Sequence, residues 1–186
     1  DKLHQCLSLG FRAWAQGHLG QGSAAHNMRA RMGRMAHALG GALMLDEWFD
    51  AADAELALLD QRYEEALDRG RGVSKRARAS GSLLAQGIGE RVWGHAVWQL
   101  GGTATECDRH FRHSLDALER GGLFPQAART RLEWAELFHK RGEDEAAARQ
   151  AGAAFMLLHN CHLPHATAAA RALRARLPAA LFDLPD

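Results

Sequence analysis

The second half of the chain repeats one pattern of apolar and turn residues at an interval of about 40 residues, a length typical of helical repeats. In segment 105–120 the expected buried side consists of Cys107, Phe111, Ser114, Leu115 and Leu118. The same relative positions later carry Ala147, Ala151, Ala154, Phe155 and Leu158. The preceding helices also correspond, in the pairs Val92 and Leu132, His95 and Ala135, Trp98 and Phe138, and Gly102 and Gly142. Because one two-helix hairpin cannot bury its apolar side alone, this recurrence predicts hairpins that stack on one another.

The composition favours helices over strands. The chain has three Val, one Ile and four Thr among 186 residues, whereas Ala and Leu are abundant. This balance suits helices and disfavours strands. Apolar residues make up 47% of the chain, which is enough for a continuous core. We therefore expect an all-α fold, an α-solenoid of antiparallel helical hairpins with about nine helices.

Glycine pairs and prolines mark the expected helix ends. We expect breaks near Gly70 to Gly72 and near Gly87 to Gly89, among others. The expected helices include 3–16, 23–39, a long segment 45–69 that can break near Asp60, a helix between Ser74 and Gly87, 91–100, 105–120, 143–160 and a capping helix 165–177. The resulting domain prediction is divergent hairpins over 1–89, regular repeats with the cap over 90–177, and a tail over 178–186.

The charge gives no general attraction to nucleic acid or to an anionic membrane, because the formal net charge is only +1. We expect no direct nucleic-acid binding by this segment. A basic run could contact phosphates locally, but it has no interleaved aromatic residue and is more typical of a solvated face or docking patch. Its members are Arg69, Arg71, Lys75, Arg76 and Arg78.

The sequence disfavours a membrane-spanning protein, a disulfide-linked protein and an enzyme. The apolar runs are short and broken by charged residues, far below the ~20 residues of a membrane-spanning helix. Three widely spaced cysteines do not suggest a disulfide framework, so we expect a cytoplasmic setting. The chain contains no Gly-x-Ser-x-Gly, His-Glu-x-x-His or phosphate-loop motif. We expect a non-enzymatic protein that needs no cofactor, and the first residue, Asp1, suggests a piece of a larger protein.

The second half resembles the tetratricopeptide repeat family. Its pattern of small, aromatic, glycine, small and small residues is matched by Ala135, Phe138, Gly142, Ala147 and Ala154. The preceding unit matches with one departure, because His95 stands at the first small position. The interval of about 40 residues exceeds the usual length of about 34 in the family, so the repeats resemble the longer arrays of bacterial signal-transduction ATPases, including LuxR-type transcriptional activators.

The resemblance implies a non-catalytic protein–protein docking module within such a regulator. The implied partner is another protein or an adjacent domain of the same chain. The alternative is a domain that senses a small-molecule effector. In the family, the first helix of each hairpin lines the binding face, and the polar residues that map there are Gln99, Arg129, Glu136 and His139.

One short segment offers ligands that zinc favours. His159, Cys161, His162 and His165 place three imidazoles and one thiol within seven residues. However, Pro164 interrupts the helix there, and four ligands so close in sequence rarely complete a tetrahedron. An ordinary solvated loop between hairpins is therefore the favoured interpretation, with metal binding as the alternative.

Overall fold

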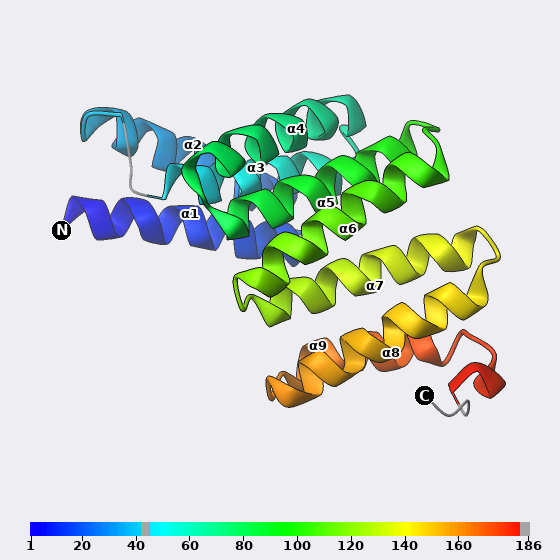
Figure 1. Ribbon diagram of the computed structural model, residues 1–186. Helices are drawn as coiled ribbons and strands as arrows, with labels where there is room; N and C mark the ends of the chain where they lie inside the picture. The colour runs from blue at the N-terminus through cyan, green and yellow to red at the C-terminus, as the bar shows by residue number, and fades with distance from the viewer. Residues whose placement is uncertain (42–44, 183–186) are drawn as a thin grey trace. The chain divides into compact units, whose positions relative to one another are not determined.

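The computed structural model describes residues 1–41 and 45–182, and within these residues all regular secondary structure is helical (Figure 1). The described residues form nine α-helices, as expected, and a short 3₁₀-helix, η1. Their bounds are α1 Lys2–His18, α2 Gly22–Ala38, α3 Asp46–Leu59, α4 Tyr63–Ser80, α5 Leu83–Gln99, α6 Ala104–Arg120, α7 Phe124–Lys140, α8 Asp144–Asn160, α9 Pro164–Arg174 and η1 Ala179–Phe182. None of the described helices combines the length and the apolar character needed to cross a membrane.

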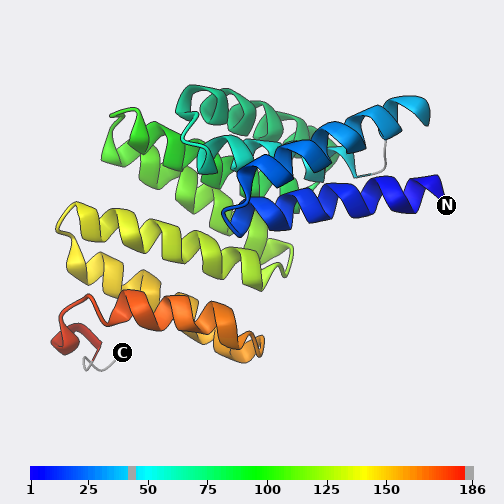
Figure 2. The ribbon, with the colours of Figure 1, turned by 180° about the vertical axis from the view of Figure 1, so that it is seen from behind.

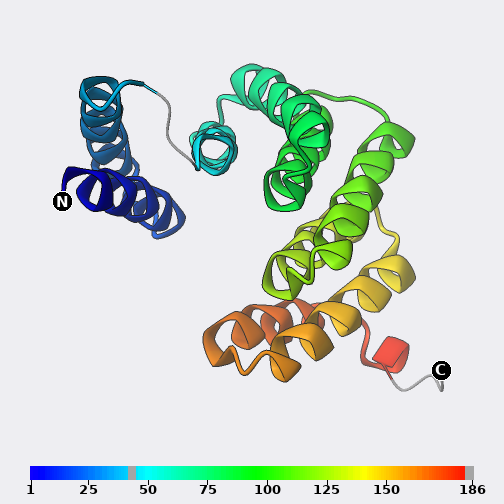
Figure 3. The same ribbon diagram turned by 60° about the vertical axis from the view of Figure 1, so that its left-hand side comes forward.

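The chain divides into two compact units, Asp1–Cys107 and Asp108–Asp186. In the first unit α1 packs on α2, α3 on α4, and α4 on α5. Figure 3 looks along α3, drawn in cyan, which lies between the α1–α2 pair and the α4–α5 pair. In the second unit α8 packs against α7, α9 and η1. Figure 2 shows these helices from behind. The predicted division after residue 89 falls within α5 and stays a prediction.

The turns between helices follow one rule that recurs along the chain. Each turn between two consecutive α-helices contains a residue with positive φ, and these residues include Gly20, Gly40, Gln61, Gly81, Gly101, Gly122, Gly142 and His162. The backbone N–H of the next residue donates a hydrogen bond to the carbonyl oxygen five residues earlier. Examples are Arg62 N to Ala57 O at 2.9 Å and Glu143 N to Phe138 O at 3.0 Å. This geometry ends a helix in the left-handed conformation and satisfies its last carbonyls.

The turn geometry corrects one part of the repeat alignment. The bond from Gly102 N to Val97 O, 2.8 Å long, corresponds to the bond from Glu143 N to Phe138 O. Val97 of α5 is therefore equivalent to Phe138 of α7. The expected pairing of Trp98 with Phe138 is wrong by one position. Gly94, which is buried, takes the small position that His95 was expected to fill. The second helices do follow the expected alignment, because Leu123 N to Leu118 O and Leu163 N to Leu158 O are equivalent.

Two expected breaks are wrong, because Gly70 and Gly89 lie inside continuous helices α4 and α5. A Cβ atom on Gly70 would lie 3.0 Å from the carbonyl oxygen of Gly89, and one on Gly89 would lie 2.9 Å from the amide nitrogen of Ser74. The two glycines therefore permit the backbones of α4 and α5 to touch. The expected helix between Ser74 and Gly87 is replaced by the ends of these two helices, which meet at a turn around Gly81. The break near Asp60 is present, with Asp60 ending α3.

The interior consists mainly of small side chains. In the first unit, alanines of α3, α4 and α5 surround Val73, Ile88 and Val92. In the second unit, Ala128, Ala154 and Ala170 meet beside Leu158. Alanine at a helix contact lets the axes approach closely and costs no side-chain entropy on burial. Of the residues expected in the interior, Phe111, Leu115 and Leu158 are buried and Phe155 is half-buried.

Candidate docking surface

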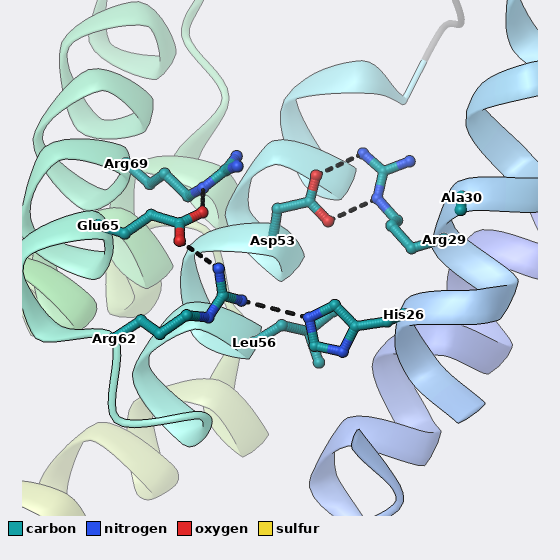
Figure 4. Close-up of a pocket in the computed structure, with 8 residues that line it drawn as sticks. All are labelled: His26, Arg29, Ala30, Asp53, Leu56, Arg62, Glu65 and Arg69. Carbon is teal, nitrogen blue, oxygen red and sulfur yellow. Dashed lines mark hydrogen bonds and ion pairs between the residues drawn. The ribbon is translucent and has the colours of Figure 1, made fainter. Parts of the chain in front are cut away.

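A set of charged side chains on the first unit surrounds a hollow between α2 and α4, with α3 as its floor (Figure 4). The hollow has a volume of about 370 Å³. Its lining residues are His26, Arg29, Ala30, Asp53, Leu56, Arg62, Glu65 and Arg69. Ala30 and Leu56 supply the apolar part of this surface. The remaining side chains are ionisable, so the hollow suits a ligand that carries charged groups.

One ion pair joins α2 to α3 across the hollow. Arg29 holds Asp53 with two nitrogens, Nε to Oδ1 at 2.5 Å and Nη2 to Oδ2 at 2.7 Å. Both side chains are about one-fifth exposed, so water screens the pair less than it screens a surface pair. The bidentate geometry is the strong arrangement for a guanidinium and a carboxylate. This pair therefore fixes one wall of the hollow relative to its floor.

Two arginines share one carboxylate on the opposite wall. Arg62 and Arg69 both donate to Glu65, the latter from Nε at 2.6 Å. The hydrogen bond from Arg69 is the main cause that lowers the pKa of Glu65, and Arg62 adds to it against the opposing effect of burial. Burial lowers the pKa of Arg62, but its bonds to Asp60 and Glu65 outweigh that effect and raise it. Glu65 is therefore a carboxylate anion held between two cations.

His26 adds a contact from α2 to the start of α4. Its Nδ1 lies 2.8 Å from the carbonyl oxygen of Gly22, which can only accept, so Nδ1 carries a proton. In the neutral ring Nε2 then accepts from Arg62 Nη2 at 3.2 Å. If Nε2 were protonated, it could instead donate to Asp60 Oδ2, which lies 3.1 Å away.

Two further hollows adjoin the first, one between α2 and the turn before α4 and the other along α4. One, of about 820 Å³, shares His26 and Arg62 with it. The other, of about 290 Å³, shares Arg69 and extends to Asp50 and Arg76. We call the three hollows together the α4 furrow. Arg76 Nη2 donates to Asp50 Oδ2 at 2.8 Å. An arginine therefore lines each section of the furrow, and these are Arg62, the N-cap of α4, and Arg69 and Arg76 of α4.

A second polar cluster lies inside the first unit, around Glu55 of α3. Its carboxylate accepts from Trp14 Nε1 at 2.5 Å and from the guanidinium of Arg91 on α5. His18 Nε2 lies 3.1 Å from the same carboxylate. Glu55 therefore joins α1, α3 and α5 through one buried group, which the sequence pattern did not single out.

No family model matches the sequence, and no curated protein sequence matches it. A solved structure does resemble it: the Signal Transduction ATPase with Numerous Domains (STAND) protein with a tetratricopeptide repeat sensor from Pyrococcus horikoshii. The TM-score is 0.62 at 14% sequence identity, and the likeness covers 93% of this chain and 27% of that protein. The fold is a tetratricopeptide-like helical repeat. At this identity the likeness establishes the fold, and the chain spans about a quarter of the length of the protein that it resembles.

The predicted contact residues lie on α5 and α7, and each has a partner within the chain. Gln99, at the end of α5, lies 3.2 Å from His95 through their side-chain nitrogens. On α7, Arg129 Nε donates to Glu133 at 3.0 Å. Their role in partner binding stays a prediction.

The other two predicted residues of α7 tie that helix to its neighbours. Glu136 forms an ion pair with Arg176, and His139 Nδ1 lies 2.7 Å from Asp144 Oδ1 at the start of α8. A partner would have to exchange these internal contacts for its own. Their role in docking also stays a prediction.

The possible metal ligands lie around the turn between α8 and α9. Among the described residues, His159, Cys161 and His162 do not form a group whose three ligand atoms all lie within 4.8 Å of one another. His159 stacks on Phe155 at 6.1 Å between ring centroids. The side chain of His165 lies outside what the structure describes. Metal binding here stays a prediction.

The basic run singled out from the sequence is divided among different faces of α4. Arg69 and Arg76 line the furrow, whereas Arg78 Nη2 donates to the buried Glu90 at 2.6 Å. Sequence reasoning missed Arg62 and Arg29. The spacing of Arg62, Arg69 and Arg76 at seven-residue intervals was a signal for Arg62, because seven residues are nearly two helical turns. Nothing local in the sequence pointed to Arg29.

Proposed function

We propose that the chain is a non-catalytic protein-docking module of a larger cytoplasmic regulator of the STAND type or of a related transcriptional activator. The tetratricopeptide-like fold supports this proposal, as does the likeness to a signal-transduction ATPase with a tetratricopeptide repeat sensor. The partner is another protein or an adjacent domain of the same chain. The module contributes binding, and flanking domains contribute any nucleotide chemistry or DNA contact.

The α4 furrow is the observation that carries the proposal. Its walls come from helices of two successive hairpins, α2 and α4, and its surface combines apolar atoms of Ala30 and Leu56 with fixed ion pairs. Such a mixture is typical of the surface of a protein–protein interface, where charged groups set specificity around a small apolar centre. A segment of a partner that enters the furrow contacts both hairpins at once.

A steric block of the furrow tests this proposal. Ala30→Trp places a large side chain in the hollow and leaves every ion pair unchanged, and Ala172→Trp is its matched control because Ala172 is exposed on α9 of the second unit. We expect cross-linking to capture a saturable protein partner with the wild-type chain and with Ala172→Trp, and about tenfold less with Ala30→Trp.

The outcomes separate the two functional hypotheses. If the wild-type chain and both variants capture the partner equally, the docking function stands and the furrow is excluded as the binding site. If no protein is captured, while a small metabolite changes the tryptophan fluorescence saturably, the domain is an effector sensor. Failure of both measurements rejects the proposed function.

A further inference from the structure

A groove of about 630 Å³ follows one face of α8 in the second unit. We call it the α8 groove. Its lining residues on α8 begin at Glu145 and end at Met156, a rise of about 16.5 Å or about three turns. Among them Arg149, Gly152, Ala153 and Met156 are three or four residues apart, as on one face of a helix. Residues of α9 and of η1, which packs against α8, complete the lining.

The part of the groove formed by α8 is apolar and open. Met156 is an apolar side chain, yet 56% of it is exposed. Ala153 lies one turn before it, and a Cβ at Gly152 would meet no atom within 4 Å. Small residues at a helix surface let another helix approach closely, and burial of Met156 favours the approach of an apolar ligand.

The guanidinium of Arg174, on α9, lines the same groove and contacts two phenylalanine rings. Its Cζ lies 5.2 Å from the ring centroid of Phe155 and 4.3 Å from that of Phe182. These contacts hold the guanidinium in place, but they do not use the N–H donors in its plane. Among the described residues Arg174 has no hydrogen-bond acceptor and no ion-pair partner. It therefore keeps a planar fork of donors for a carboxylate.

The charge around the α8 groove is unbalanced, unlike that of the α4 furrow. The lining carries two guanidinium groups, of Arg149 and Arg174, and one carboxylate, of Glu145. Glu145 lies 4.0 Å from Arg149, and both side chains are more than two-thirds exposed, so this pair is weak. The stretch 146–182 contains no Asp or Glu, which leaves the positive charge of Arg174 without a neighbouring carboxylate in that stretch. This excess of positive charge is complementary to an acidic ligand.

We propose that the α8 groove binds an amphipathic α-helix of a partner protein, with an apolar side flanked by carboxylates. The apolar side lies against Ala153 and Met156, and Arg174 binds one carboxylate with two parallel hydrogen bonds. A helix fits this apolar groove because its backbone N–H and C=O groups bond to one another, whereas an extended segment would leave such groups unpaired. The groove lies in the second unit, so the inference adds a contact surface beyond the α4 furrow and the function proposed for it.

Three labelled peptides test the chemistry of the ligand. The first is a cross-linked helix of about three turns with Leu on one side and Glu on both flanks of that side. The second has Lys in place of each Glu, and the third keeps the composition of the first but distributes the Leu residues around the helix. We expect the whole chain to bind the first at least about tenfold more tightly than either of the others, in a fluorescence anisotropy titration at low ionic strength.

Substitutions of arginine locate the carboxylate contact. Arg174→Gln should weaken the Glu peptide about tenfold, as expected for the loss of one bidentate charge-assisted contact. Arg174→Lys keeps the charge but loses the planar fork, so its effect should be intermediate. Arg31→Gln removes the same charge from an exposed position of α2 in the first unit, and it should change binding less than about twofold.

Substitutions of exposed apolar residues locate the apolar contact. Met156→Gln should weaken the Glu peptide about fivefold, because the peptide then buries a polar side chain. Leu19→Gln is the matched control, since Leu19 is 69% exposed and lies in the first unit, and it should leave the affinity unchanged. Circular dichroism that matches the wild type shows that each variant remains folded.

Four results would overturn the inference. They are equal affinity for the Glu and Lys peptides, equal effects of Arg174→Gln and Arg31→Gln, equal effects of Met156→Gln and Leu19→Gln, and no binding of any peptide. The proposed docking function is judged separately. If the peptides fail to bind while Ala30→Trp reduces capture of a protein partner, docking at the α4 furrow stands and the α8 groove is not a docking site.

Discussion

Arg91 donates a hydrogen bond to Glu55 inside the first unit, where only 1% of one side chain and 2% of the other reach the surface. Two charges in an apolar interior lose their hydration, and their mutual attraction must offset that loss. Trp14 and His18 of α1 lie at the same carboxylate, so the pair also holds three helices in register.

Removing the negative charge of Glu55 should therefore destabilise the chain. Glu55→Gln removes the carboxylate that Arg91, Trp14 and His18 contact in the interior, and we expect the free energy of unfolding to fall by about 3 kcal/mol. Urea denaturation followed by circular dichroism measures the loss. Glu64→Gln, on the exposed side of α4, is the matched control and should change stability by less than about 0.5 kcal/mol. Similar losses for the two variants would contradict a stabilising role for the buried carboxylate.

Adding a methyl group at the α4–α5 contact should also destabilise the chain. The Cβ of Gly89→Ala would lie 2.9 Å from the backbone nitrogen of Ser74, so the helices must separate, and we expect a loss of about 1–3 kcal/mol. Gly33→Ala is the control, because it lies inside α2 and a Cβ there has no neighbour within 4 Å. That substitution should raise stability by about 0.5–1 kcal/mol through helix propensity. If thermal denaturation shows that the melting temperatures of both variants shift in the same direction, the close contact between α4 and α5 is contradicted.

The pKa of Glu65 should depend on Arg69. The hydrogen bond from Arg69 is the main cause that holds this pKa below 4.5, so Arg69→Gln should move it upward while Arg31→Gln leaves it unchanged. Because the pKa is lowered by folding, Glu65 contributes stability above its unfolded pKa and loses that contribution as the pH falls through its folded pKa. The contribution is small, since the carboxylate is 37% exposed. A carboxyl ¹³C NMR titration measures the shift, and identical titration curves in wild type and Arg69→Gln would exclude this cause.

The three cysteines should differ in reactivity. Cys6 is buried, and burial raises its pKa, which Arg29 only partly opposes. Cys107 is also buried, whereas Cys161 is half-exposed. Since the thiolate is the reactive form, we expect one thiol per chain to react rapidly with a disulfide reagent and Cys161→Ser to abolish that phase. A rapid phase that survives in Cys161→Ser would show that a buried cysteine is reached by the reagent.

The candidate site was only partly visible in the sequence. Arg69 and Arg76 share a face of α4 because of helical periodicity, which any reader of the sequence can apply, and Arg62 is the N-cap residue just before that helix. The pairing of Arg29 with Asp53 joins residues 24 positions apart, and it depends on how α2 and α3 are packed. Glu55 lies in an apolar stretch of α3, where nothing local distinguishes a buried charge from one that faces water.

The sequence by itself determined the helices and their approximate repeat, because helix propensity and turn glycines act over a few neighbouring residues. Gly81 and Gly142 end helices through a local left-handed turn, a property of the chain at those positions. Gly70 and Gly89 are the same residue type, yet they lie inside helices, since their role is to let a distant backbone approach. Only the tertiary structure decided between these roles, and it also decided which charges meet in the α4 furrow, because both depend on distances between helices that no local preference sets.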